Sequence, residues 1–93
     1  MELAERFLKL VSFDTTSDEA ADCCPSTPNQ LSLAREIVAQ MQAMGIADAH
    51  VDQYGYVYGT VPATAPGPVI GLIAHMDTAP DAPGANIRAR ITA

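Results

Sequence analysis

The stretch VIGLIAHMDTAPDAPG, residues 69–84, decides the predicted fold because its apolar run ends abruptly at a histidine. Every position from 69 to 74 is apolar or small, and none alternates with a polar residue. Half-exposed strands alternate, whereas strands covered on both faces are continuously apolar. The run therefore predicts a buried strand within an α/β domain, built from a mixed sheet with flanking helices.

Two segments before this strand have helical periodicity. Residues 2–11 place their apolar side chains on one stripe, which predicts a short amphipathic helix. A second helix is predicted to begin at Pro28, with Thr27 as its N-cap and Gln30 completing a capping box. Gly45 suits the left-handed residue that ends such a helix.

The tripeptide His50-Val51-Asp52 is the first of two His-x-Asp sequences in the chain. Residues 47–54 alternate small or apolar positions with polar ones, which is typical of a strand with one solvated face. Together with YGYVYGTVPA, residues 54–63, they predict a hairpin that turns near Gly55. His50 and Asp52 share the polar face of this strand, so a structural interpretation is favoured for both.

The second His-x-Asp, at His75 and Asp77, follows the continuously apolar run. Ligands of open α/β sheets bind outside the carboxyl ends of the strands. Residues i and i+2 of an extended segment point the same way, so the Asp77 carboxylate can reach the His75 ring. One interpretation is a metal-binding imidazole oriented by a carboxylate, with a divalent ion such as zinc. The other is a histidine at a strand end that bonds a nearby acid for packing alone, and the pattern leaves both open.

The loop after Asp77 is stiffened by Pro80 and Pro83 and ends at Gly84. These residues suit the wall of a binding site and equally suit a surface turn. Asp81 is the one further polar residue in this loop that we add to the candidate site.

Composition excludes several classes of protein for this chain of 93 residues. Eleven acidic residues against five basic ones give a net charge of −6, which disfavours binding to nucleic acid or to anionic membranes. No apolar run approaches the roughly 18 residues of a membrane helix, and the N-terminus lacks the pattern of a signal peptide. Cys23 and Cys24 are adjacent and are predicted to be free thiols. The expected location is the cytoplasm.

Four segments of the chain resemble the peptidase T family of tripeptide aminopeptidases, within the co-catalytic zinc peptidase and deacylase superfamily. They are ERFLKLVSFDTTSD, PSTPNQ, YVYGTVPAT and IGLIAHMDTAPDAPG. The last is the most specific, because the superfamily shares His-x-Asp whereas the following Thr-Ala-Pro-Asp is similar to this family. The resemblance implies that His75 is a ligand of one of two zinc ions and that Asp77 is the acidic residue with a catalytic role beside it. It also implies a small peptide substrate, a tripeptide cut at its N-terminal bond.

The same resemblance implies a general base within a Glu-Glu pair, and the sequence contains no such pair. We therefore expect residues 1–93 to be an incomplete N-terminal part of a metallopeptidase catalytic domain, inactive by itself. Two alternatives stay open. One is a dipeptidase or amino-acid deacylase of the same superfamily, which the Thr-Ala-Pro-Asp sequence argues against. The other is a non-catalytic binding or scaffold module whose His-x-Asp is structural.

Overall fold

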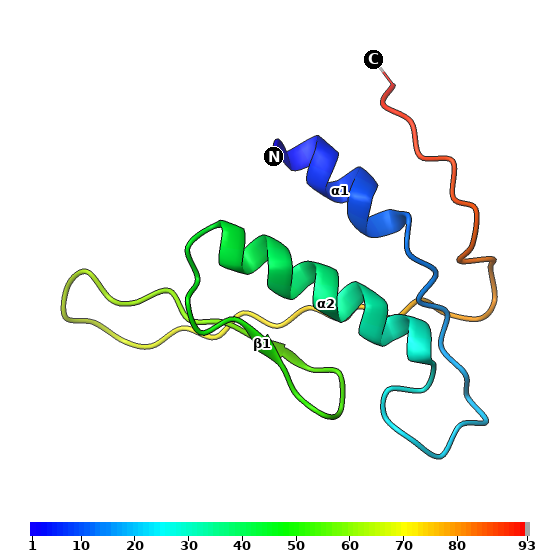
Figure 1. Cartoon of the computed structure of the whole chain (residues 1–93), viewed down its shortest axis with the longest axis horizontal. Helices are drawn as coiled ribbons and strands as arrows, with labels where there is room; N and C mark the ends of the chain where they lie inside the picture. The colour runs from blue at the N-terminus through cyan, green and yellow to red at the C-terminus, as the bar shows by residue number, and fades with distance from the viewer. Residues whose placement is uncertain (93) are drawn as a thin grey trace.

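Two helices and one small hairpin make up the regular structure of the computed structural model, which describes residues 1–92 (Figure 1). The order along the chain is α1 (Leu3–Val11), α2 (Pro28–Ala43), β1 (His50–Val51) and β2 (Val57–Tyr58). Helix α2 contacts α1 and both strands, so it is the central element. The predicted helices are confirmed. Neither of the two described helices is long and apolar enough to cross a membrane.

Helix α2 begins at Pro28 as predicted, but the predicted capping box is wrong. The hydroxyl of Thr27 donates to the carbonyl oxygen of Thr16 at 3.0 Å, not to an amide of its own helix. The buried Gln30 side chain also turns to the preceding loop, where its Nε2 lies 3.5 Å from the Thr15 carbonyl oxygen. Both residues therefore tie the start of α2 to the loop that follows α1.

The core is small and lies between α2 and the start of the hairpin. Its buried apolar residues are Leu33, Ala34 and Ala49. Helix α1 joins α2 through a polar contact, in which Arg6 Nη1 donates to Gln40 Oε1 at 2.8 Å. Since apolar burial is limited, polar contacts between segments fix much of the arrangement.

The predicted hairpin is confirmed, with strands shorter than expected. Strands β1 and β2 pair antiparallel, with His50 opposite Tyr58 and Val51 opposite Val57. Gly55 lies in the turn with φ +85°, a backbone conformation that side-chain-bearing residues rarely adopt. The local sequence signals thus placed the turn correctly.

The predicted buried strand at 69–74 is wrong for the part of the chain that the structure describes. This segment forms no strand, and Val69, Leu72 and Ile73 are 100%, 96% and 101% exposed. A central strand needs partners on both edges and layers over both faces, and residues 1–92 place none there. The sheet they form is therefore antiparallel and two-stranded instead of mixed, although helices and a sheet are both present.

Candidate functional site

His75 and Asp77 are brought together, as their spacing predicts. His75 Nδ1 lies 2.9 Å from the Asp77 carbonyl oxygen and 3.1 Å from Asp77 Oδ1. A carbonyl oxygen only accepts hydrogen bonds, so Nδ1 carries the proton and donates to both oxygens. In the neutral ring, Nε2 then keeps its lone pair. The two side chains are 85% and 50% exposed, so this nitrogen belongs to a solvent-facing ring.

The pair is positioned by a loop instead of by a sheet. After α1, the chain at residues 14–17 runs beside residues 76–78, where an isolated parallel bridge joins Thr16 and Thr78 (Figure 1). The Thr78 amide donates to the Thr15 carbonyl oxygen at 3.1 Å, and the Ser17 amide donates to the Thr78 carbonyl oxygen at 2.9 Å. We call residues 14–17 the Asp-Thr loop. The sequence showed it only as a polar, turn-rich stretch and gave no sign of its partner.

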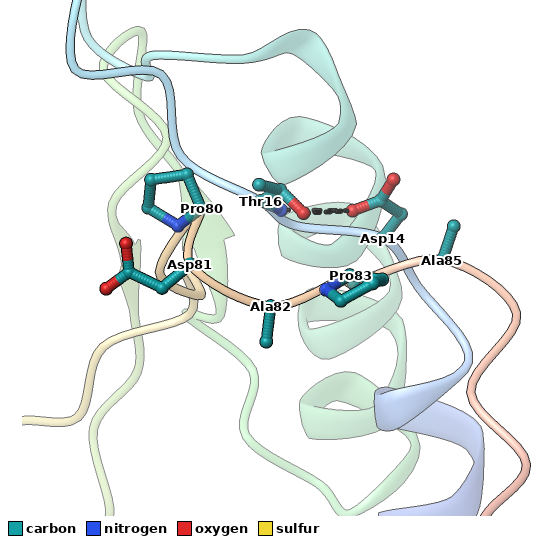
Figure 2. A pocket seen from close by; sticks show the side chains of 8 residues that line it. Asp14, Thr16, Pro80, Asp81, Ala82, Pro83 and Ala85 are labelled. Atoms are coloured by element: carbon teal, nitrogen blue, oxygen red, sulfur yellow. Dashed lines mark hydrogen bonds between the residues drawn. The ribbon is translucent and has the colours of Figure 1, made fainter.

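A shallow depression of about 410 Å³ opens where the Asp-Thr loop meets residues 80–85 (Figure 2). Asp14 and Thr16 line it on one side, and Asp14 Oδ1 accepts from Thr16 Oγ1 at 2.6 Å and from the Thr16 amide at 3.1 Å. These hydrogen bonds hold the pKa of Asp14 below its ordinary value, the hydroxyl bond having the larger effect.

Asp81 lines the same depression, from the proline-rich loop that follows the His75 segment. Figure 2 shows its carboxylate directed away from Asp14 and Thr16. Within residues 1–92 it makes no hydrogen bond to His75 or Asp77. The structure therefore places Asp81 near the candidate site without joining it to the histidine pair.

The first His-x-Asp has a different geometry. His50 Nδ1 lies 2.7 Å from the carbonyl oxygen of Asp48, a residue that precedes it. Asp52 Oδ1 accepts from the amides of Tyr54 and Tyr56, each at 2.9 Å, and so holds the hairpin turn. His50 and Asp52 thus bond to backbone groups within or next to the hairpin, which agrees with the structural interpretation.

Among residues 1–92, the geometry of His75 would suit one ligand of a zinc site. No group of three or more His, Cys, Asp or Glu side chains among residues 1–92 could hold a metal ion. Catalytic zinc is usually held by three protein ligands, so the described residues do not complete such a site. The imidazole of His75, with its second ring nitrogen bonded to Asp77, still has the arrangement of a metal-binding histidine.

The predicted free thiols are confirmed, as Cys23 and Cys24 are unbridged and exposed.

Comparison with known proteins gives a consistent result. No protein-family model matches the chain. Peptidase T of Geobacillus sp. (strain WCH70) is 46% identical over 92 residues, covering 97% of this chain and 22% of that protein. Peptidase T of Bacillus subtilis (strain 168) is 45% identical over 92 residues, with the same two coverages. Peptidase T of Desulfitobacterium hafniense (strain Y51) is 49% identical over 89 residues, covering 94% of this chain and 22% of that protein.

These relatives are peptidases by name, and the identity extends along almost the whole chain. The resemblance to peptidase T is therefore confirmed. The chain spans about 22% of the length of the curated relatives it matches.

Proposed function

We propose that residues 1–93 form the first part of the catalytic domain of a zinc-dependent aminopeptidase that removes the N-terminal residue of tripeptides. The single observation that carries this proposal is the His75–Asp77 pair, with Nδ1 engaged and Nε2 on a solvent-facing ring. The high identity to proteins named peptidase T supports it.

In this proposal His75 contributes one imidazole ligand through Nε2. Two zinc ions, when bound, would polarise the scissile carbonyl and lower the pKa of a bound water. Asp77 accepts a hydrogen bond from Nδ1–H of His75, which fixes the ring's tautomer, orients the ring and raises the basicity of Nε2. The remaining ligands and the general base would come from another part of the protein, so this chain alone would not hydrolyse peptides.

A cytoplasmic location belongs to the same proposal. The adjacent Cys23 and Cys24 are free and exposed, which is typical of proteins in a reducing compartment. A superfamily dipeptidase or deacylase would use the same pair. The names of the relatives, together with the Thr-Ala-Pro-Asp sequence after Asp77, favour the tripeptide aminopeptidase.

Calorimetry with zinc on this chain tests the ligand role directly. We expect weak binding that is lost in His75→Ala and retained in His50→Ala, the matched control from the other His-x-Asp. Equal binding by the wild-type chain and His75→Ala would contradict the ligand role and favour a scaffold module.

A chimera tests the catalytic role. Here this chain replaces the matching segment of Bacillus subtilis peptidase T, with which it shares 45% identity. Tripeptide hydrolysis by the chimera should fall by about 10- to 100-fold in Asp77→Ala and at least as much in His75→Ala, and persist in His50→Ala. Full turnover by a folded His75→Ala or Asp77→Ala chimera would remove that residue from the mechanism.

A further inference from the structure

Thr15 holds both peptide groups that flank Asp77. Its hydroxyl donates to the carbonyl oxygen of Met76 at 2.8 Å, and this oxygen belongs to the peptide group between residues 76 and 77. Its own carbonyl oxygen accepts the amide of Thr78 at 3.1 Å, and this amide belongs to the peptide group between residues 77 and 78. One residue, distant in sequence, therefore fixes the backbone on each side of the acid.

We propose that Thr15 is a positioning residue for the His75–Asp77 pair, acting through the backbone of Asp77. The catalytic consequence of this inference rests on the proposed function, whereas the geometric consequence does not.

The planarity of the peptide bond gives the physical reason. With two rigid peptide planes held, φ and ψ of Asp77 are fixed, and with them the direction in which its side chain leaves the backbone. The carbonyl oxygen of Asp77 lies in the same plane as the Thr78 amide, so the bond from that amide to Thr15 also orients the carbonyl. Thr15 thereby sets the Asp77 carbonyl oxygen and the direction in which the Asp77 carboxylate extends, and both groups accept a hydrogen bond from His75 Nδ1–H.

Thr15 is itself held firmly. Thr15 is 3% exposed, whereas the other residues of the Asp-Thr loop are half-buried, so Thr15 is the buried point of the contact. The neighbouring Thr16 carbonyl accepts the Thr27 hydroxyl at the start of α2, and Gln30 of α2 lies against Thr15. The Asp-Thr loop therefore anchors the backbone of Asp77 to helix α2, the central element of the fold.

The hydroxyl of Thr15 has a different role from the backbone hydrogen bond between Thr15 and Thr78. The bridge to Thr78 needs only the main chain and would form with any residue at position 15 that can adopt the same backbone conformation. Only a hydroxyl reaches the Met76 carbonyl, and this bond restrains the peptide group between Met76 and Asp77. Without it, this peptide group can rotate and the ring and carboxylate can move apart.

Two substitutions separate the hydroxyl from the packing of Thr15. Thr15→Val keeps the shape and deletes the hydroxyl, and Thr15→Ser keeps the hydroxyl and deletes the methyl group. The readout on this chain is the tautomer of His75, measured by long-range proton–nitrogen NMR at a fixed pH at which the ring is neutral. We expect Thr15→Val to lower the ratio of the Nδ1–H form to the Nε2–H form by about fivefold, the effect of losing one typical hydrogen bond. Thr15→Ser should keep the wild-type ratio.

His50 is an internal control in every sample, because its Nδ1 also bonds a carbonyl oxygen but lies in the hairpin. Its tautomer should stay unchanged in both variants. An unchanged His75 ratio in Thr15→Val with an intact His50 signal would overturn the proposal. So would a shift in Thr15→Ser alone, since that result would assign the effect to the methyl group.

A measurement on the wild-type chain keeps the test independent of the folding of the variants. A scalar coupling across the hydrogen bond from the Thr78 amide to the Thr15 carbonyl should be detectable, and its absence in a folded sample would overturn the proposal.

Zinc calorimetry then separates the positioning role of Thr15 from the proposed function. A Thr15-dependent tautomer without any zinc binding would uphold the positioning role and contradict the proposed function.

Discussion

Gly84 lies directly against Thr16, although the two residues belong to different loops. A Cβ atom at position 84 would stand 2.5 Å from Thr16 Oγ1 and 2.6 Å from Asp14 Oδ1. Real Cβ atoms essentially never approach other atoms so closely. The end of the proline-rich loop can therefore rest on the Asp-Thr loop only because residue 84 has no side chain.

Gly84→Ala should separate the two loops. The methyl group would displace the Thr16 hydroxyl from Asp14 or push residues 80–85 outward, at a cost of about 1–3 kcal/mol. Hydrogen exchange of the Ser17 and Thr78 amides, which bond across the contact, should accelerate. Gly67→Ala is the matched control, because a Cβ there meets nothing within 4 Å. Equal exchange rates in both variants would contradict the close approach.

The ionisation of Asp14 should depend on the Thr16 hydroxyl. Hydrogen bonds from the Thr16 side chain and then its amide lower the pKa of Asp14 below 3.8. Because the folded-state pKa is depressed, the associated stability is present above the unfolded-state pKa and is lost as the pH falls through the folded-state pKa. Thr16→Val should raise the pKa of Asp14 toward 3.8 in a carbon-detected NMR titration. Thr16→Ser, which keeps the hydroxyl, should leave it low, and an unchanged pKa in Thr16→Val would refute the assignment.

Asp52 should stabilise the hairpin through its carboxylate, since Oδ1 accepts the amides of Tyr54 and Tyr56. Asp52→Ala leaves both amides without this acceptor and should lower the free energy of unfolding by about 1–2 kcal/mol in urea titrations. Asp52→Asn retains a side-chain oxygen and should lose less. If Asp52→Ala unfolds at the wild-type urea concentration, the turn does not depend on this side chain.

Cys24 should control the ionisation of one tyrosine. Its Sγ lies 4.0 Å from the hydroxyl oxygen of Tyr56, and the hydrogen bond with this thiol is the largest cause that raises the pKa of Tyr56 above 10.0. Cys24→Ala should therefore lower the pKa of Tyr56 toward 10.0, followed by NMR of the ring carbons.

Cys23→Ala is the control, because the Cys23 thiol bonds the Pro25 carbonyl instead. A pKa of Tyr56 that responded equally to both substitutions would show a general effect of the loop and contradict a specific contact with Cys24.

Features that depend on neighbours along the chain could be predicted from the sequence. The two helices follow from the spacing of apolar residues, and the turns at Gly45 and Gly55 follow from glycine's access to positive φ, observed at 91° and 85°. The contact between His75 and Asp77 belongs to the same group, because it joins residues two positions apart.

Predictions that required distant partners were wrong or absent. The apolar pattern of residues 69–74 predicted a covered strand, yet pairing depends on strands that residues 1–92 do not place beside it. The capping box at Thr27 is a local pattern, but it failed because the Thr27 hydroxyl bonds Thr16, eleven residues earlier in the loop between the two helices. A sequence pattern indicates which neighbours a segment needs, and the tertiary contacts decide whether those neighbours are present.

The sequence by itself determined the local elements, the acidic character and the pairing of the His75 imidazole with an acid two residues later, since each follows from short-range geometry or composition. Only the tertiary structure decided how that acid is held. Thr15 reaches Met76 across 61 positions of chain, and no periodicity in the sequence encodes a hydrogen bond between two irregular segments at that separation. Its physical cause is the folding of the Asp-Thr loop against α2, which brings a buried hydroxyl to the backbone beside Asp77.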